Sequence, residues 1–400
     1  MNSILSDRIL NMEESATLAM AKKARELKAQ GIDIISLSLG EPDFKTPKHI
    51  QQAAKDAIDE GKYFAYPPVA GYQDLREAIA KKLREENNIA EAKAEHIVIS
   101  VGAKHSIANT FMCIINEGDE VVIFSPYWVS YAEIIKLCGG VPVLIEGTLE
   151  NNFKATAAQL EAAITSKTKA VIYSSPCNPT GSVFSQQELE AIADVVKKHP
   201  NMVVIADEIY ELINFTGKNF SIASLPGMFE RTVTVNGFSK GYAMTGWRVG
   251  YICAPLEISK AVEKMQGQFT SGNTGIAQRA ALAGIAGDQT PSQEMADQYL
   301  IRRDLVLGLL RDIPGIKTHV PEGAFYFFPD VTAFFGKSAH GHSVANADDL
   351  CLYLLAVANV SLVTGSAFGA PNCVRISYAA SEAELIEAMK RIKKALGDLA

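Results

Sequence analysis

From about residue 95 to residue 254 the sequence alternates between short apolar runs and longer segments of mixed polarity. Most of the apolar runs are continuous and rich in β-branched residues, which is typical of strands buried on both faces of a mainly parallel sheet. The segments between them are long enough for crossover helices. We therefore predict an α/β domain in which helices cover both faces of a mainly parallel, seven-stranded sheet. Its expected strands are 96–101, 120–125, 141–146, 170–175, 202–207, 232–237 and 248–254.

The segments on either side of this region have a different pattern. A helix is expected after Ser15, a typical N-cap residue, and it should end at Gly31. From about residue 295 the sequence predicts a helix, a strand pair around 325–328 and a closing helix from Ala383. We expect these C-terminal elements to pack with the N-terminal segment as a smaller α+β domain. The predicted division is an arm and part of the small domain in 1–45, a large domain in 46–294, and the C-terminal small domain in 295–400.

Composition and charge exclude several classes of protein. The net charge of −7 comes from interspersed acidic and basic residues, and no run of Lys or Arg offers a surface for nucleic acid. No apolar run approaches the length of a membrane span, and the N-terminus lacks the apolar region of a secretory signal. The six cysteines form no CxxC pair and have no regular spacing, so they indicate neither disulfides nor a metal site. We therefore expect a cytoplasmic protein without a bound metal.

The segment NGFSKGYAMTGWRVGY, residues 236–251, contains the first candidate catalytic residues. Lys240 follows an apolar strand in a loop with two glycines, and Arg248 comes eight residues later. A desolvated lysine has an accessible neutral form that can form a Schiff base with a carbonyl group. An arginine offers a phosphate a rigid fork of donors. Taken alone, a Ser-Lys pair is more often part of a surface loop.

Two further polar groups lie at the ends of apolar strands. Asp207 ends one strand and Tyr210 follows three residues later, while Asn178 stands between two prolines in SSPCNPTG. An acid beside a pyridine nitrogen keeps that nitrogen protonated, and a phenol can hydrogen-bond the ring oxygen. The structural alternatives are that a strand-end acid caps the next helix and that Asn-Pro is an ordinary turn.

Three weaker signals complete the set. Gly102, Ala103 and Lys104 lie between a strand and a helix, where free N–H groups and the helix dipole can bind a phosphate. Trp128 could stack on a ring, and Arg375 could hold a carboxylate through two hydrogen bonds. Each of these residues is more often structural when it occurs singly.

In this combination and order, the motifs resemble those of the class I aminotransferases of pyridoxal-phosphate (PLP) fold type I. The matching segments cover essentially the whole chain: LSLGEPDF, YPPVAGYQDLREAIA, SVGAKHSI, SPYWVSY, SSPCNPTG, IADEIYE, NGFSKGYAMTGWRVGY, PEGAFYFFP and CVRISYAAS. The sequence is most similar to the bacterial aspartate aminotransferase subgroup with GWRVGY after the lysine. The resemblance implies fold type I and pyridoxal 5′-phosphate as the cofactor of the large domain.

The resemblance also implies a role for each candidate residue. Lys240 would carry PLP as a Schiff base and then move the proton during the reaction, and Asp207 would pair with the ring nitrogen. The other cofactor contacts implied are Tyr210 and Asn178 at the ring oxygen, Trp128 on the ring face, and Ala103, Lys104, Arg248 and a second subunit's Tyr66 at the phosphate. The last contact requires a homodimer with shared active sites. The residues implied to bind the substrate α-carboxylate are Arg375, Asn178, Trp128 and the backbone of Gly40.

Thr17 and Lys104 stand where this subgroup binds the distal carboxylate of a dicarboxylic substrate. The implied reaction is a ping-pong transfer of the amino group from L-aspartate to 2-oxoglutarate, giving oxaloacetate and L-glutamate. The alternative is an aminotransferase for aromatic, alanine or prephenate substrates. Two positions depart from the pattern. Glu13-Glu14 replaces a Lys-Pro pair of many relatives, which argues against prephenate, and Gly237 replaces a phosphate-binding serine for which Ser239 could compensate.

A protein of another class, in which an aminotransferase-like domain serves as a PLP sensor fused to a DNA-binding module, is disfavoured. Such a protein needs an additional winged-helix segment, and the chain starts directly with the aminotransferase arm. A purely scaffolding role is disfavoured because every expected cofactor contact has a candidate residue.

Overall fold

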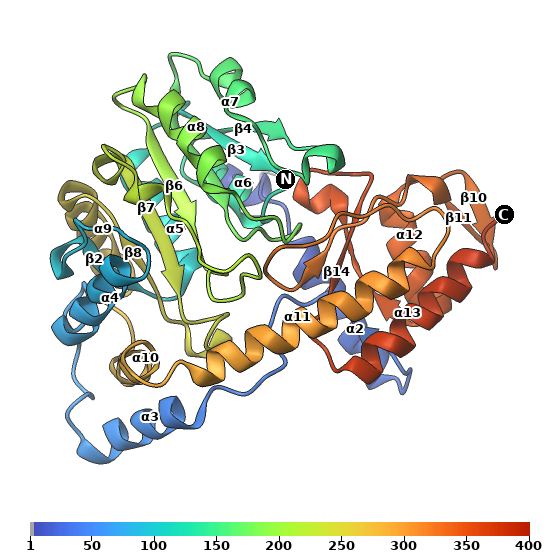
Figure 1. The fold of residues 1–400 in the computed structure, drawn as a ribbon, viewed down its shortest axis with the longest axis horizontal. Coiled ribbons are helices and arrows are strands. Elements are labelled where there is room, and N and C mark those ends of the chain that lie inside the picture. The colour runs from blue at the N-terminus through green and yellow to red at the C-terminus, as the bar shows by residue number, and fades with distance from the viewer. Residues whose placement is uncertain (1–3) are drawn as a thin grey trace.

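The computed structural model describes residues 4–400, which form a larger part built on a central sheet and a smaller part (Figure 1). The sheet has seven strands in the order β2-β8-β7-β6-β5-β3-β4. These are β2 (Ile97–Ser100), β3 (Glu120–Ser125), β4 (Val141–Glu146), β5 (Thr168–Ser174), β6 (Val203–Asp207), β7 (Thr232–Gly237) and β8 (Gly250–Cys253). The predicted mainly parallel seven-stranded α/β sheet is confirmed, and each strand starts and ends within two residues of its expected position.

The direction of each strand decides where a site can form. The strands β4, β3, β5, β6 and β7 pair in parallel, whereas β8 is antiparallel to both β7 and β2. The chain makes this reversal between Gly237 and Gly250, in the segment that contains Lys240. Consequently β2, β3, β5, β6 and β7 all point their carboxyl ends to one edge, where ligands bind in open α/β sheets.

Most strands of the central sheet contain continuous apolar runs, so helices have to cover both faces of the sheet. Ile172 and Ile205 pack toward the helices α5 and α6, whereas Val171 and Val204 pack toward α7 and α8 on the opposite face. All four side chains are fully buried, and each burial stabilises the fold by about 1.5–3 kcal/mol. The helices of the larger part are α3 (Lys48–Glu60), α4 (Gln73–Glu85), α5 (Ala103–Ile114), α6 (Ser130–Leu137), α7 (Ala157–Ala163), α8 (Gln186–Lys197), α9 (Leu256–Phe269) and α10 (Gly275–Ala286).

The smaller part joins segments from both ends of the chain. Near the N-terminus, β1 (Ile35–Ser36) pairs in parallel with β12 (Val360–Ser361). A second, antiparallel sheet has the order β13-β14-β9. Its remaining elements are α2 (Ala16–Ala29), β9 (Tyr326–Phe327), β10 (Lys337–Ala339), β11 (His342–Val344), α12 (Ala347–Tyr353), β13 (Val363–Thr364), β14 (Val374–Ser377) and α13 (Glu382–Gly397). The domain limits expected from the sequence stay a proposal.

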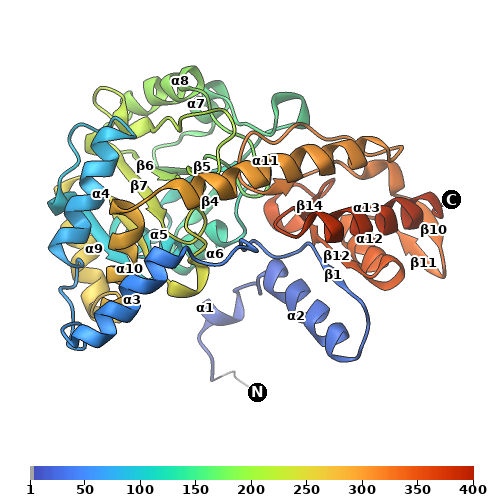
Figure 2. The ribbon, with the colours of Figure 1, turned by 60° about the horizontal axis from the view of Figure 1, so that its bottom comes forward.

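One long helix, α11 (Thr290–Arg311), runs from the larger part into the smaller one (Figure 2). It begins five residues before the helix expected from residue 295, because Thr290 and Pro291 form a favourable first turn. In its middle, Arg302 donates a 2.7 Å hydrogen bond to the Asp43 carboxylate, and its guanidinium lies 4.9 Å from the centre of the Phe44 ring. This contact ties α11 to the segment just after Gly40.

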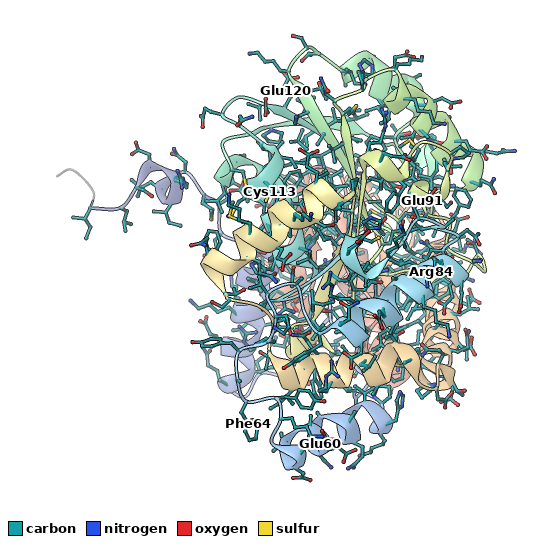
Figure 3. All side chains as sticks on the ribbon, turned by 90° about the vertical axis from the view of Figure 1, so that its left-hand side faces the viewer. Glu60, Phe64, Arg84, Glu91, Cys113 and Glu120 are labelled. Atoms are coloured by element: carbon teal, nitrogen blue, oxygen red, sulfur yellow. The ribbon has the colours of Figure 1, made fainter. Side chains whose placement is uncertain are left out.

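The N-terminal helix α1 (Asp7–Leu10) stands away from the body of the molecule (Figure 3). Phe64, in the loop after α3, also points outward in that view, and 68% of its surface is exposed. Across residues 4–400, none of the helices is both long and apolar enough to cross a membrane. The same residues contain no group of three or more His, Cys, Asp or Glu side chains arranged to hold a metal ion.

Candidate active site

A cavity of about 580 Å³ lies at the carboxyl edge of the sheet, between it and the segment from Ser15 to Glu41. It collects side chains that are far apart in the sequence. Of the residues expected from the sequence, those that line it are Thr17, Gly40, Ala103, Lys104, Trp128, Asn178, Asp207, Tyr210, Lys240, Arg248 and Arg375. Tyr66 is not among them, and 91% of its surface is exposed. Its expected contact involves a second subunit and stays a prediction.

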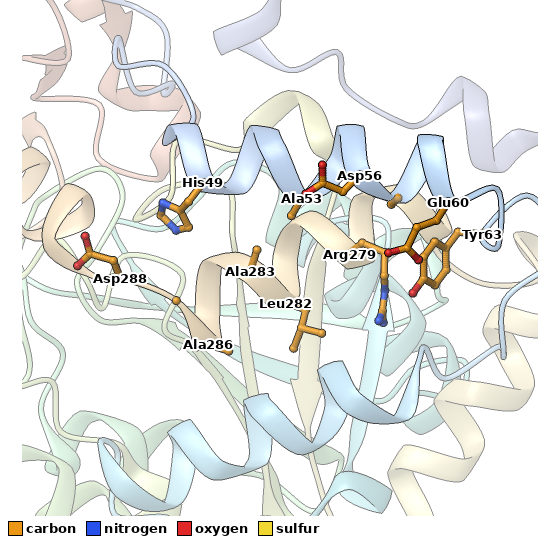
Figure 4. Close-up of a pocket in the computed structure, with 12 residues that line it drawn as sticks. His49, Ala53, Asp56, Glu60, Tyr63, Arg279, Leu282, Ala283, Ala286 and Asp288 are labelled. Carbon is orange, nitrogen blue, oxygen red and sulfur yellow. The ribbon is translucent and has the colours of Figure 1, made fainter.

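A second hollow of about 590 Å³ lies between α3 and α10 (Figure 4). Its most buried charged group, Arg279, donates two hydrogen bonds of 2.5 and 2.7 Å to the Asp74 carboxylate. None of the residues expected to be functional lines this hollow. We therefore take the cavity at the sheet edge as the candidate active site.

Lys240 lies in the loop that connects β7 to β8. Its ammonium donates a hydrogen bond to the carbonyl oxygen of Gly40 and lies 5.7 Å from the centre of the Tyr210 ring. Burial lowers the pKa of the lysine to about 8, although the nearby Glu41 carboxylate acts in the opposite direction. A lysine in this condition has a neutral, nucleophilic form within reach near physiological pH.

Asp207 is the last residue of β6 and is 97% buried, with 3% of its surface exposed. Its Oδ2 atom accepts a hydrogen bond of 2.5 Å from the Tyr131 hydroxyl, and Oδ1 accepts one of 3.2 Å from the Ile209 N–H. Burial raises the pKa of this carboxyl to about 6, while both hydrogen bonds oppose that effect. The carboxylate is therefore a buried anion suited to pairing with a cationic group in the cavity.

Arg375, on β14, is the buried cation of the cavity, with 1% of its surface exposed. Its Nη1 donates to Asn178 Oδ1 at 2.9 Å and its Nη2 donates to the Ser38 carbonyl at 2.6 Å. The Tyr326 ring centre lies 4.6 Å from the guanidinium carbon. The Nε atom has no hydrogen-bond partner within residues 4–400. A buried donor without a partner costs free energy, so the site suits a ligand carboxylate.

The start of α5 forms a cradle of close backbone contacts. Gly102 has φ +85°, which favours glycine, and a β-carbon there would lie 2.5 Å from Nη2 of Arg248. A β-carbon on Gly250 would lie 2.3 Å from the Ala103 nitrogen. The two glycines thus let an arginine and a helix N-terminus approach each other, which is an arrangement that binds phosphate.

Gly237, where a serine was expected by comparison with other enzymes, has no room for a side chain. A β-carbon there would lie 2.8 Å from both the Val249 carbonyl oxygen and the Gly250 Cα. Ser239, the residue expected to compensate, is 7% exposed and lines the cavity. The close pairing of β7 with β8 therefore explains this departure.

Thr17 and Lys104, the two residues expected to bind a second carboxylate, both line the cavity. Thr17 lies in the first turn of α2, and the Lys104 ammonium lies 4.8 Å from the centre of the Trp128 ring. Glu13 is exposed just before this helix, and its backbone N–H donates to Glu133 at 3.1 Å.

Sequence reasoning missed two tyrosines that support the expected residues. Tyr131 hydrogen-bonds Asp207, and Tyr326 shares a 2.7 Å hydrogen bond with the Tyr210 hydroxyl. Tyr131 follows Trp128 by three residues, a spacing that places both on one face of a helical turn and could have indicated it. No spacing in the sequence relates Tyr326 to Tyr210.

Known proteins resemble this chain over nearly its whole length. Residues 32–392 match the family of class I and II aminotransferases. A probable aspartate/prephenate aminotransferase of Rhizobium leguminosarum is 45% identical over 398 residues, which cover 99% of each chain. The aspartate aminotransferase of Rhizobium meliloti has a crystal structure with a TM-score of 0.95, 40% identity and full coverage of both chains. The aspartate aminotransferase of Thermus thermophilus with maleate has a TM-score of 0.91 and 40% identity, and covers 99% of this chain and 100% of its own.

Proposed function

Because this chain belongs to the class I and II aminotransferases, we propose that it is a PLP-dependent aspartate aminotransferase that transfers the amino group of L-aspartate to 2-oxoglutarate, yielding oxaloacetate and L-glutamate. The observation that carries the proposal is one cavity that contains both a partly buried lysine of lowered pKa and a fully buried arginine. Lys240 is suited to covalent attachment of a carbonyl group, and Arg375 to a carboxylate.

The residues present fit PLP. The glycine cradle at the start of α5, with Arg248 against it, suits the phosphate, and the buried Asp207 suits a protonated ring nitrogen. Trp128 would cover the ring face, and Tyr210 and Asn178 would contact the ring oxygen. Bound PLP supplies a carbonyl for the substrate amine and a protonated ring that withdraws electrons from the substrate Cα.

Lys240 is the proposed acid–base residue that moves the proton of the substrate Cα. With its amine free and neutral, Nζ would act as the general base that takes the proton from the substrate Cα and as the acid that returns it. The lowered pKa, about 8, favours the neutral amine that this step needs. In the second half of the ping-pong cycle the same nitrogen moves a proton in the reverse direction, with 2-oxoglutarate as the acceptor.

Two separate groups of cavity residues would bind the two carboxylates of the substrate. Arg375 and Asn178 would hold the α-carboxylate, together with the Gly40 backbone and Trp128. Thr17 and Lys104, which also line the cavity, would bind the distal carboxylate. The Thermus thermophilus relative was solved with maleate, a dicarboxylate, which supports this part of the proposal.

We also propose a homodimer in which Tyr66 of each subunit completes the partner's phosphate site. Support comes from an exposed aromatic patch, defined as Phe64, Tyr66 and Phe269, whose side chains are 68%, 91% and 62% exposed. The segments that carry the patch adjoin, since a β-carbon on Gly272 would lie 3.4 Å from the Pro68 carbonyl oxygen. Apolar patches of this kind mark protein–protein interfaces. A cytoplasmic location stays a prediction from the cysteine pattern.

An absorption spectrum of the purified protein with PLP tests the proposal. Addition of L-aspartate without a keto acid should replace the visible band of the lysine-bound cofactor with the band of pyridoxamine phosphate, and 2-oxoglutarate should reverse the change. A cofactor band that responds to phenylalanine or alanine but not to aspartate would contradict the substrate. Absence of a visible band with Lys240 intact would contradict the cofactor.

Prephenate is a second candidate acceptor, because the Rhizobium leguminosarum relative is named a probable aspartate/prephenate aminotransferase. Against it, Glu13 and Glu14 are exposed immediately before Ser15, which lines the cavity. These two acids stand where many relatives have a Lys-Pro pair, so the chain lacks a lysine there that could bind a carboxylate of prephenate. We expect kcat/KM for prephenate to be lower than kcat/KM for 2-oxoglutarate. The substitution Glu13→Lys should bring the two values closer together. A higher kcat/KM for prephenate in the unmodified enzyme would reverse this preference.

A further inference from the structure

Asp207 is held from behind by a tyrosine that lies outside the cavity lining. The Tyr131 hydroxyl donates to Asp207 Oδ2 at 2.5 Å, and only 1% of Tyr131 is exposed. The other carboxylate oxygen, Oδ1, accepts from the Ile209 N–H at 3.2 Å. Each oxygen of the carboxylate is therefore fixed by one donor of the protein, which sets the direction of the whole group.

Trp128, the ring-stacking candidate, lies just before α6, and Tyr131 lies in the first turn of that helix. Trp128 and Tyr131 lie in the turn that opens α6, where the Tyr131 N–H donates to the Trp128 carbonyl at 3.0 Å. Their rings meet edge to face with centres 5.6 Å apart. Tyr131 also packs into the apolar cluster between the sheet and α5, α6 and α9. Its ring is thereby locked, so the position of its hydroxyl is determined by the fold.

In the hydrogen-bonded pair of Tyr131 and Asp207, the phenol is the protonated group and the carboxylate is the acceptor. Burial keeps the pKa of the Tyr131 phenol well above 10, so this hydroxyl stays a neutral donor. A carboxyl group that receives this bond is stabilised as the anion, which counteracts the effect of burial on Asp207. Without the phenol, Asp207 would be a buried carboxyl with one partner fewer, and its neutral form would be favoured.

We propose that Tyr131 is a positioning residue whose hydroxyl keeps the Asp207 carboxylate ionised and directed at the protonated ring nitrogen of the cofactor. This inference rests on the proposed function, because it assumes PLP with its ring nitrogen at Asp207. Tyr131 does not touch the cofactor or the substrate, and it acts only through the carboxylate. Its loss should therefore weaken recognition of the ring nitrogen and leave recognition of the phosphate unchanged.

The experiment compares two ligands on full-length protein stripped of cofactor. One ligand is PLP and the other is its carbocyclic analogue, in which C–H replaces the ring nitrogen. Tyr131→Phe should raise the dissociation constant of PLP roughly 10- to 100-fold, the range for a lost hydrogen bond to a charged group. The dissociation constant of the analogue should change less than about threefold, because it has no nitrogen to pair with Asp207. As a second readout, loss of PLP binding on acidification should begin at a higher pH in the variant, since Asp207 is then harder to ionise.

Tyr353→Phe is the matched control. It also removes one buried hydroxyl, which donates to the Ala395 carbonyl at 2.7 Å in the smaller part of the molecule. It should lower stability by about as much as Tyr131→Phe without changing the affinity ratio of the two ligands. Equal weakening of PLP and analogue binding by Tyr131→Phe would show a merely structural role and overturn the inference. If the unmodified protein binds PLP no more tightly than the analogue, the pairing at Asp207 is wrong. If it binds neither ligand, the proposed function itself fails.

Discussion

Replacing Arg375 by lysine should separate cofactor binding from substrate binding. The side chain is 1% exposed and donates to Asn178 and to the Ser38 carbonyl, with Nε left for a ligand. Lysine keeps the charge but not the planar fork of donors. The variant loses one hydrogen bond to a charged group, worth about 1.5–3 kcal/mol, and frees Asn178 Oδ1, which costs about 1–3 kcal/mol. We therefore expect kcat/KM for L-aspartate to fall roughly 10²- to 10⁴-fold.

Steady-state kinetics with L-aspartate, combined with titration of the apoprotein with PLP, would measure both effects. The PLP dissociation constant should rise by less than about tenfold, because Arg375 reaches the proposed cofactor contacts only through its hydrogen bond to Asn178. Arg76→Lys is the matched control, since Arg76 Nε donates to the Ala94 and Ile97 carbonyls away from the cavity. It should lower stability and leave kcat/KM unchanged. An unchanged kcat/KM in Arg375→Lys would refute the assignment of the α-carboxylate to this residue.

Three further changes test other parts of the site. Lys240→Met should abolish transamination and stabilise the apoprotein at pH 7 by about 3 kcal/mol, because the fold lowers the pKa of this lysine from 10.5 to about 8 and so disfavours the charged amine. That gain should shrink between pH 8 and pH 10.5, and urea unfolding at pH 7 and pH 10 that showed no such decrease would contradict it. Lys104→Met should lower kcat/KM for L-aspartate roughly 10-fold or more but spare L-alanine, and equal losses for both donors would rule out a role in reading the distal carboxylate. Phe269→Asp places a charge in the exposed aromatic patch and should give a monomer with weaker PLP binding in sedimentation velocity and titration, whereas a dimer that persists would place the interface elsewhere.

The sheet could be predicted because its strands are buried on both faces, and strands of this kind have continuous apolar, β-branched sequences. The run MVVIAD contains three consecutive β-branched residues that favour a strand, and β6 starts and ends within a residue of that run. The reversal at β8 was harder, because an antiparallel partner of β7 has the same apolar sequence as a parallel one. The first turns of α11 were missed because Thr290 and Pro291 continue the preceding polar segment, and Pro291 reads as part of a loop until the helix is seen.

The site was predictable to the extent that its residues occur in recognisable segments. Lys240, Asp207 and Arg375 each follow or lie within an apolar strand, and these strands place them around one cavity. Tyr326 was not predictable, because it is one aromatic residue in a run of four and its partner Tyr210 lies 116 residues away. Contacts of this kind depend on how the two parts of the molecule meet, which no local pattern in the sequence encodes.

The helix α11 also has a mechanical consequence. Its 22 residues form a rod about 33 Å long. A swing of about 10° around its first turn would carry its far end through about 6 Å, taking the attached strands and α13 with it. The Arg302–Asp43 pair lies near the middle of the rod, so Arg302 would move through about half that distance. Because Asp43 is three residues from Gly40, which accepts the hydrogen bond of Lys240, the same pair links the rod to the segment that lines the cavity.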